Sequence, residues 1–161
     1  MTVASIPMPR SLSLDTAAVV TERSKRTWQR RIADGGVGRL SDDPRGRAMV
    51  RLSDVQPLLC VPLSADELTV LCDADSGSAG AQRDVGQVFD LQGKPEIAVY
   101  WWGQAADQGD ADAMQCLGHS YAAGRGVEVD ENLALMWIAR AAAQGHVIAR
   151  AQTKGLLPCD G

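Results

Sequence analysis

The sequence of 161 residues has few aromatic side chains, two histidines and no long apolar run. Only 4% of its residues are Phe, Trp or Tyr, so its core must be built from Ala, Leu and Val, as in chains of packed helices. No apolar run approaches the ~18 residues that a membrane-spanning helix needs. The start of the chain lacks a basic region followed by an apolar stretch, so we predict no signal peptide and expect a cytoplasmic location.

Residue sets for catalysis or metal binding are also missing. Cys60, Cys72, Cys116 and Cys159 form no Cys-x-x-Cys pair, which favours reduced thiols. Cys116 and His119 have the spacing of half a metal site, but no further cysteine or histidine completes it, so we predict that Cys116 packs in a core. The sequence shows no Ser-His-Asp set and no phosphate-binding glycine loop. We therefore expect no enzymatic activity, no cofactor and no metal.

The charges are unevenly distributed along the chain. Residues 1–56 contain ten Lys or Arg and six Asp or Glu, whereas residues 57–161 contain six basic and fourteen acidic residues. A basic N-terminal segment favours a polyanionic partner, which the acidic remainder would repel. The sequence therefore predicts two parts with two different roles.

The N-terminal segment has the residue pattern of three short helices and a hairpin. We expect helices at 15–21, 24–33 and 54–59, and extended segments at 38–41 and 48–52. Ser24 is a suitable N-cap for the second helix, and Asp34-Gly35-Gly36 should end it, with a glycine as the left-handed residue. Trp28 and Ile32 lie four residues apart, so they share a face that should pack against the first helix.

A known family pattern covers about residues 12–58. The residues that carry it are Leu14, Ala17-Ala18, Ser24-x-x-Thr27, Arg30-Arg31-Ile32-x-x-Gly35 and Val50-x-Leu52-x-Asp54-Val55. With the predicted order of elements, they resemble the winged helix-turn-helix of the MerR and excisionase type. The resemblance implies that the second helix enters the major groove of DNA and that the wing touches the backbone. Carried over by position, the DNA-binding residues would be Ser24, Lys25, Arg26, Gln29 and Arg30 on the helix, with Arg45 and Arg47 on the wing.

The residues themselves also favour DNA contact. Five cations lie between Arg23 and Arg31, and Arg, Lys and Gln side chains can read base edges. The chain departs from the family at the preceding turn, where Thr21, Glu22 and Arg23 replace an apolar residue, a glycine and another apolar residue. The alternatives are a merely solvated basic face or a domain kept for docking to proteins.

The rest of the chain contains an internal repeat. Ala98-x-x-Trp101-x-x-x-Ala105-Ala106-x-Gln108-Gly109 returns 36 residues later as Ala134-x-x-Trp137-x-x-x-Ala141-Ala142-x-Gln144-Gly145. Val85-Gly86-x-x-Phe89 returns 32 residues later as Leu117-Gly118-x-x-Tyr121. The longer loop Gly124–Asp130 of the second unit explains the difference between the two shifts. These motifs resemble the Sel-like repeats (SLR), which are tetratricopeptide-like helical hairpins.

The repeat pattern predicts six helices and a division of the chain. The helices are expected at 64–74, 79–91, 95–107, 111–123, 130–144 and 147–156. We expect Gly86 and Gly118 to allow close helix packing, and Trp101 and Trp137 to fill the space between the helices of a unit. The fold class is mainly α: a winged helix-turn-helix domain with a small β-hairpin at 11–59, a linker at 60–63 and a short α-solenoid of repeats at 64–157.

The resemblance to these repeats implies a protein or peptide partner. Gln87, Gln115 and His119 are predicted to lie off the packing faces of the first helices and to make polar contacts with that partner. We therefore interpret the chain as a DNA-binding regulator whose repeats mediate protein–protein interaction. The alternative is an interaction adaptor whose helix-turn-helix no longer binds DNA. The candidate partners are double-stranded DNA, a protein or peptide and a second copy of the chain in a homodimer, with no membrane partner.

Overall fold

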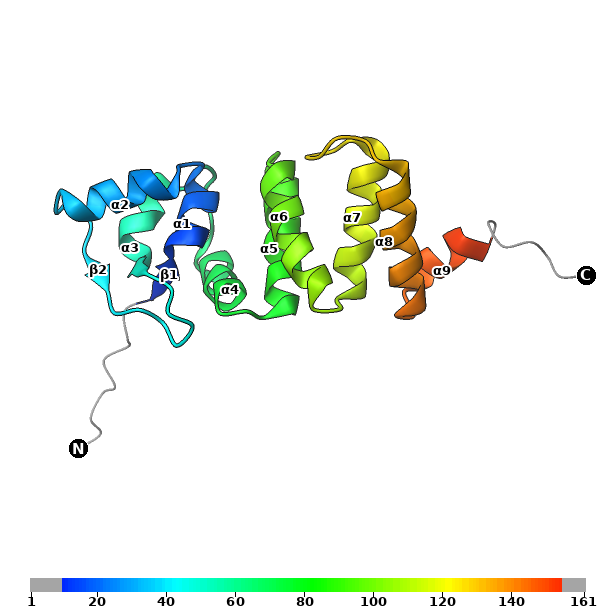
Figure 1. The fold of residues 1–161 in the computed structure, drawn as a ribbon, viewed down its shortest axis with the longest axis horizontal. Coiled ribbons are helices and arrows are strands. Elements are labelled where there is room, and N and C mark those ends of the chain that lie inside the picture. Colours follow the sequence, from blue (N-terminus) through cyan, green and yellow to red (C-terminus); the bar gives the residue numbers. More distant parts are fainter. Residues whose placement is uncertain (1–9, 155–161) are drawn as a thin grey trace, which may run out of the picture. The chain divides into compact units, whose positions relative to one another are not determined.

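The computed structural model describes residues 10–154, which form two compact units divided between Leu63 and Ser64. The first unit contains the β-strands and the second contains helices (Figure 1). No helix within residues 10–154 is long and apolar enough to cross a membrane.

The first unit is a small three-stranded sheet with short helices. Its elements are β1 (Ser11–Ser13), α1 (Leu14–Thr21), α2 (Lys25–Ala33), β2 (Arg39–Leu40), β3 (Met49–Arg51), α3 (Leu52–Val55) and the 3-10 helix η1 (Gln56–Leu58). The sheet is antiparallel with strand order β1-β3-β2, and it pairs Leu12 with Val50 and Leu40 with Met49. Strand β1 was not predicted, because a three-residue strand has too few positions to show an alternating pattern.

A buried hydrogen-bond chain fixes the turn between α1 and α2. The indole Nε1 of Trp28 donates to Thr21 Oγ1 (3.1 Å), which donates in turn to the carbonyl of Ala17 (2.6 Å). Trp28 is fully buried, as the spacing predicted, whereas Ile32 is half-buried. Ser24 accepts a hydrogen bond from the N–H of Thr27 (3.1 Å), so it is the N-cap of α2, as expected.

Glu22 ends α1 in a left-handed backbone conformation, which turns the chain toward α2. It adopts the left-handed conformation (φ 52°, ψ 36°), and it is the only non-glycine residue within residues 10–154 with positive φ. The N–H groups of Glu22 and Arg23 bond to the carbonyls of Val19 and Ala18, which closes the end of α1. The polar turn is therefore tight, and its geometry is the one that glycine adopts most easily.

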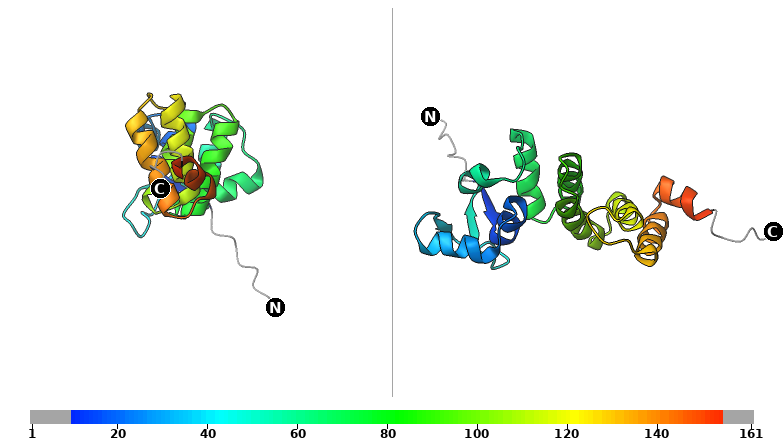
Figure 2. Two further views of the ribbon diagram at one scale, coloured as in Figure 1. Left: turned by 90° about the vertical axis from the view of Figure 1, so that its right-hand side faces the viewer. Right: turned by 90° about the horizontal axis from the view of Figure 1, so that it is seen from above.

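The second unit consists of six consecutive helices, which follow one another in chain order (Figure 2). They are α4 (Ala65–Asp75), α5 (Ala79–Leu91), α6 (Pro95–Asp107), α7 (Ala111–Ala123), α8 (Glu131–Ala143) and α9 (Val147–Lys154). Helices α5 and α6 form one hairpin and α7 and α8 form a second, and Figure 1 shows α7 and α8 side by side. The predicted bounds agree to within one residue at each end that the structure describes. The last two residues of the predicted final helix, 155 and 156, lie outside the described range.

Two glycines allow the helices of each hairpin to approach closely. A Cβ atom on Gly86 would lie 2.4 Å from Cδ1 and Nε1 of Trp102, and one on Gly118 would lie 2.5 Å from Cγ1 of Ile138. These contacts occupy equivalent positions in the two hairpins, since Trp102 and Ile138 are 36 residues apart. Gly86 and Gly118 are therefore packing positions, as the sequence analysis expected.

The repeated tryptophans differ in burial. Trp101 is fully buried, whereas Trp137 is only half-buried and packs against the core of α6–α9. The guanidinium of Arg140 lies 5.2 Å from the ring centre of Trp137. The prediction that both tryptophans fill the space between the helices of a unit is therefore confirmed for Trp101. Trp137 packs against the core but keeps part of its ring exposed.

Replacing Gly86 by Ala should destabilise the repeat unit. Alanine normally stabilises a helix by up to about 1 kcal/mol relative to glycine. At Gly86 the added methyl group would collide with Trp102, and such overpacking costs about 1–3 kcal/mol. Thermal unfolding of Gly86→Ala should therefore show a lower Tm than that of the parent.

Gly103 provides the matched control. It lies inside α6, and a Cβ atom added to it would have no neighbour within 4 Å, so Gly103→Ala should raise the Tm. The same sign of change in both variants would contradict the proposed role of Gly86.

Replacing Glu22 by Gly should stabilise the first unit relative to replacing it by Ala. Left-handed geometry costs an L-residue about 1–2 kcal/mol, and glycine relieves this strain. Part of the relief is offset because glycine has greater conformational freedom in the unfolded chain. Both variants lose the glutamate side chain, so their difference reports the backbone. Chemical denaturation should give Glu22→Gly a free energy of unfolding about 1 kcal/mol above that of Glu22→Ala, and equal values would contradict the strained conformation.

Candidate functional site

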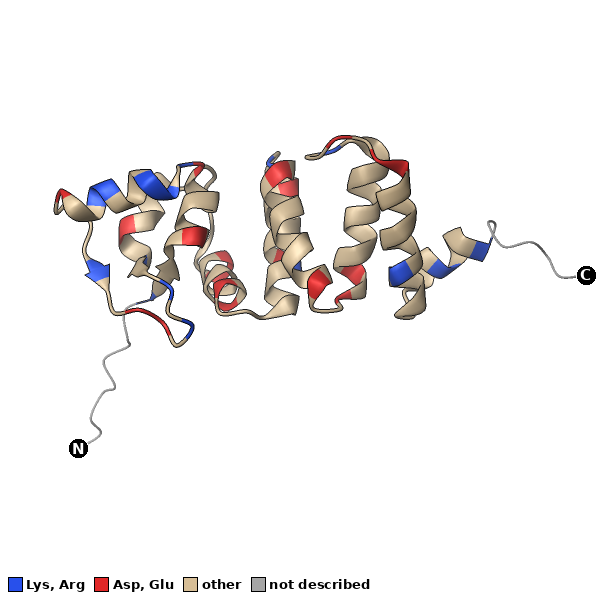
Figure 3. Ribbon diagram, in the orientation of Figure 1, with Lys and Arg blue, Asp and Glu red and all other residues tan. Residues whose placement is uncertain are grey.

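The exposed face of α2 carries cations that remain unpaired. We call Arg26, Gln29 and Arg30 the α2 basic surface; all three are exposed. Within residues 10–154 neither Arg26 nor Arg30 forms an ion pair. Lys25 is exposed as well, but its Nζ lies 2.7 Å from the carboxylate of Asp15. The structure thus brings the predicted α2 residues together on one helix and leaves two of their three cations free (Figure 3).

The two predicted wing cations are held by one carboxylate. Asp43 accepts hydrogen bonds from the backbone N–H groups of Arg45 (3.0 Å) and Arg47 (2.8 Å). The guanidinium of Arg47 also donates to Asp43 (2.8 Å), and that of Arg45 lies 3.8 Å away. The N–H of Arg47, with its guanidinium, holds the pKa of Asp43 below its ordinary value. Arg45 and Arg47 therefore bring less free positive charge to this loop than their number in the sequence suggests.

The predicted partner-binding residues of the repeats divide into exposed and buried ones. Gln87 on α5 and His119 on α7 are exposed and occupy equivalent repeat positions. Gln115 is only 5% exposed, so the prediction that it lies off the packing face is wrong. Its Nε2 donates to Oε1 of Gln152 on α9 (2.7 Å) and lies 2.9 Å from Nε2 of His119. Gln115 therefore attaches α9 to the hairpin and is not available to a partner.

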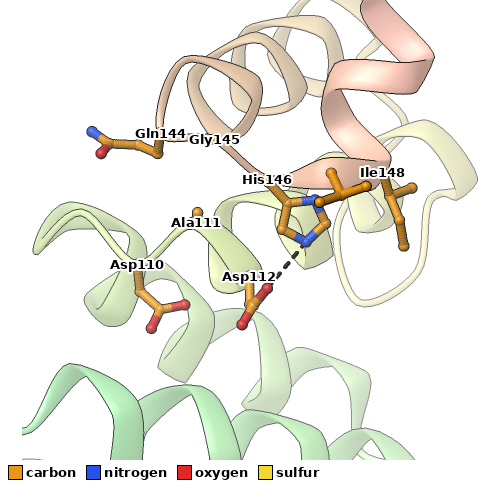
Figure 4. A pocket seen from close by; sticks show the side chains of 8 residues that line it. Asp110, Ala111, Asp112, Gln144, Gly145, His146 and Ile148 are labelled. Atoms are coloured by element: carbon orange, nitrogen blue, oxygen red, sulfur yellow. Dashed lines mark ion pairs between the residues drawn. The ribbon is translucent and has the colours of Figure 1, made fainter.

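A hollow of about 460 Å³ lies between two inter-helix turns, before α7 and before α9 (Figure 4). Asp110 caps α7 by accepting the N–H of Ala113 (2.8 Å). His146 accepts the N–H of Ala149 at Nδ1 (3.2 Å), and its Nε2 lies 3.1 Å from Asp112. From α5, the guanidinium of Arg83 reaches Asp110 (3.2 Å) and Asp112 (3.5 Å). The polar groups of this hollow thus hold helix ends together.

No described cluster has the composition of a metal site. Residues 10–154 contain no group of three or more His, Cys, Asp or Glu that could hold a metal ion. Burial raises the pKa of the Cys116 thiol to about 11, and the nearby Asp112, Asp90 and Asp110 act in the same direction. A thiol with that pKa stays protonated at neutral pH, so Cys116 is a poor nucleophile and a poor metal ligand.

The long loop between α7 and α8 returns to the preceding hairpin. Arg125 donates from Nε to the carboxylate of Asp90 at the end of α5 (2.8 Å), and its terminal nitrogen contacts the carbonyl of the same residue (3.3 Å). A Cβ on Gly126 would lie 2.5 Å from the carbonyl oxygen of Pro95. The loop residues were recognised in the sequence only as an insertion, because their partners lie in the neighbouring repeat.

The comparisons with known proteins concern the second unit. Residues 80–110 and 111–146 each match the family model of the Sel1 repeat. A solved Sel1 repeat protein from Oxalobacter formigenes is 32% identical over 51% of this chain, with a TM-score of 0.48. The chain spans 35% of the length of that protein. No curated protein matches the chain. The two segments that match the Sel1 repeat model correspond to the hairpins α5–α6 and α7–α8.

Proposed function

We propose that the chain is a DNA-binding regulator that contacts DNA through α2 and a partner protein through its Sel1 repeats. The observation that carries the DNA part is the pair of unpaired arginines, Arg26 and Arg30, on one exposed helical face. They are four residues apart, so both side chains extend from the same side of α2. Gln29 lies beside them and can form a bidentate contact with adenine.

The local architecture supports insertion of α2 into a groove. Two short helices are joined by the tight turn at Glu22, and a pair of strands follows α2. The buried Trp28 anchors the inner face of α2, which leaves its outer face for a ligand. The major groove of B-DNA is wide enough for such a helix, and phosphates on both sides would attract the arginines.

Ion pairs within the first unit determine which cations would act. Lys25 and Arg47 are paired with Asp15 and Asp43, so phosphate contact would depend mainly on Arg26 and Arg30. The same pairing favours the second candidate function, an adaptor whose first unit docks to a protein. DNA affinity of the full chain discriminates between the two functions.

The partner protein would bind along the first helices of the repeats. Gln87 and His119 are exposed at equivalent positions, so they form a repeated polar row on α5 and α7. Helical repeats bind their partners along such surfaces, because each repeat offers the next contact at a regular spacing.

Removing either free arginine should weaken DNA binding. Fluorescence anisotropy of the full chain with mixed genomic fragments should show lower affinity for Arg26→Ala and for Arg30→Ala. Each lost phosphate contact should reduce the magnitude of the salt slope of log K by roughly 0.9. Both side chains are exposed, so the Tm should stay unchanged.

Arg140→Ala is the control because it removes one exposed cation from the second unit. It should leave DNA affinity unaffected. Absence of DNA binding by the parent at low salt would refute the DNA part of the proposal and favour the adaptor.

Charge introduced into the polar row should prevent partner binding. Gln87→Glu with His119→Glu adds two carboxylates to an already acidic unit, so a partner that contacts this row should be lost from a pull-down that the parent supports. The variant should keep its DNA affinity, because both residues lie in the second unit. Since His119 is hydrogen-bonded to Gln115, circular dichroism should check that the variant keeps its helices. Undiminished recovery of the partner would place the binding surface elsewhere on the repeats.

A further inference from the structure

Helix α9 has an open face that combines apolar and cationic side chains. Val147, Arg150, Ala151 and Lys154 recur at the spacing of one helical face, and together with Ala142 and Thr153 they line a groove of about 570 Å³. We call this the α9 groove. Val147 is 80% exposed, although it is a β-branched apolar residue. The opposite face of α9 carries Ala149, which is fully buried against the core of α6–α8.

The position of α9 in the repeat explains why this face is open. A shift of 36 residues equates Lys154 with Gly118 and Ala151 with Gln115. In α7 these two positions are covered, since Gly118 contacts Ile138 of α8 and Gln115 bonds to Gln152 of α9. In α9 their counterparts line the open groove. Lys154 stands at the position that Gly118 occupies in α7. A helix could therefore not approach α9 as closely as α8 approaches α7, so the groove suits a different occupant.

The charges of the groove identify that occupant. Arg150 and Lys154 are exposed, lie four residues apart on one helix and form no ion pair within residues 10–154. Apart from these two, residues 64–154 contain four basic and thirteen acidic residues, so the rest of the described unit is acidic. Two like charges at this spacing repel each other, and carboxylates from a ligand would relieve the repulsion.

We propose that the α9 groove binds an amphipathic helix with acidic flanks from a partner protein. Its apolar side chains would cover Val147 and Ala151, and its carboxylates would pair with Arg150 and Lys154. Helix-in-groove recognition uses this combination of apolar anchors and flanking charges. The proposal is independent of the DNA contact and of the polar row on α5 and α7.

Two other occupants fit the charges less well. A symmetric dimer through this groove would bring Arg150 and Lys154 of one copy against the same residues of the other. A nucleic acid would meet Asp112, because Val147 also lines the acidic hollow of Figure 4. An acidic helix avoids both conflicts if its carboxylates lie toward Lys154.

A designed peptide pair tests the proposal with the full chain. The probes are two fluorescein-labelled helical peptides of the same length, with leucines on one face and either glutamates or lysines beside them. In fluorescence anisotropy the glutamate peptide should bind at least about tenfold more tightly, which corresponds to about 1.4 kcal/mol. Arg150→Glu with Lys154→Glu should reverse this preference, and Val147→Asp should weaken both peptides.

The control variant carries the same charge change on the first unit. Arg26→Glu with Arg30→Glu should leave the binding of both peptides unchanged, even where it abolishes DNA binding, so the two proposals fail separately. Circular dichroism checks that each variant keeps its helices. Equal affinity for both peptides, no reversal by the α9 variant, or a dimer in sedimentation equilibrium that Val147→Asp dissociates would overturn the proposal.

Discussion

The close approach of two helices at a glycine is the contact on which each repeat depends. Trp102 lies against Gly86 in the first hairpin, and Ile138 lies against Gly118 in the second. Helices at such a short distance favour small side chains at many of the other positions between them. This explains the buried alanines Ala98, Ala105, Ala113 and Ala141, which share a core cluster with the large side chain of Trp102. The alanines gain their dispersion energy from the short distance, so they stabilise the hairpin only while the glycines permit it.

N-terminal capping of α5, α7 and α9 is a second constraint, and it tolerates more variation in the residue. Ser78, Asp110 and His146 occupy the same repeat position, and each accepts a backbone N–H from the start of the helix that comes next. A hydroxyl, a carboxylate and an imidazole thus satisfy the same orphan donors. Within the second unit, the carboxylate of Asp110 also pairs with Arg83 of the preceding repeat, and the imidazole of His146 with Asp112. Capping needs only a local hydrogen-bond acceptor. The residue type of the cap can therefore vary and also contribute to contacts between repeats.

The sequence was sufficient for features that depend on neighbouring residues and insufficient for those that depend on distant ones. Helix bounds were predictable because caps, glycines and apolar spacing act within a few positions. The burial of Gln115 depends on Gln152 of α9, and no local pattern signals that hydrogen bond. Trp137 is half-buried although its repeat position matches that of the fully buried Trp101, so the repeat motif alone does not determine burial at this position. The ion pairing of Arg45 and Arg47, the two predicted wing cations, likewise depends on Asp43, which the family pattern did not include.

The pairing of cations sorts the basic residues into structural and available ones. Arg47 and Arg125 hold a loop through Asp43 and Asp90, whereas Arg26, Arg30, Arg150 and Lys154 have no ion-pair partner among the described residues. Lys25 is intermediate. Its bond to Asp15 is short, but both side chains are about half exposed, and exposed pairs contribute only about 0.2–1 kcal/mol. A phosphate could therefore replace Asp15 at little cost, whereas Arg47 would also have to leave the loop that its own backbone N–H helps to form. The cationic surface open to a ligand thus consists of helical faces, and the loop contributes shape more than charge.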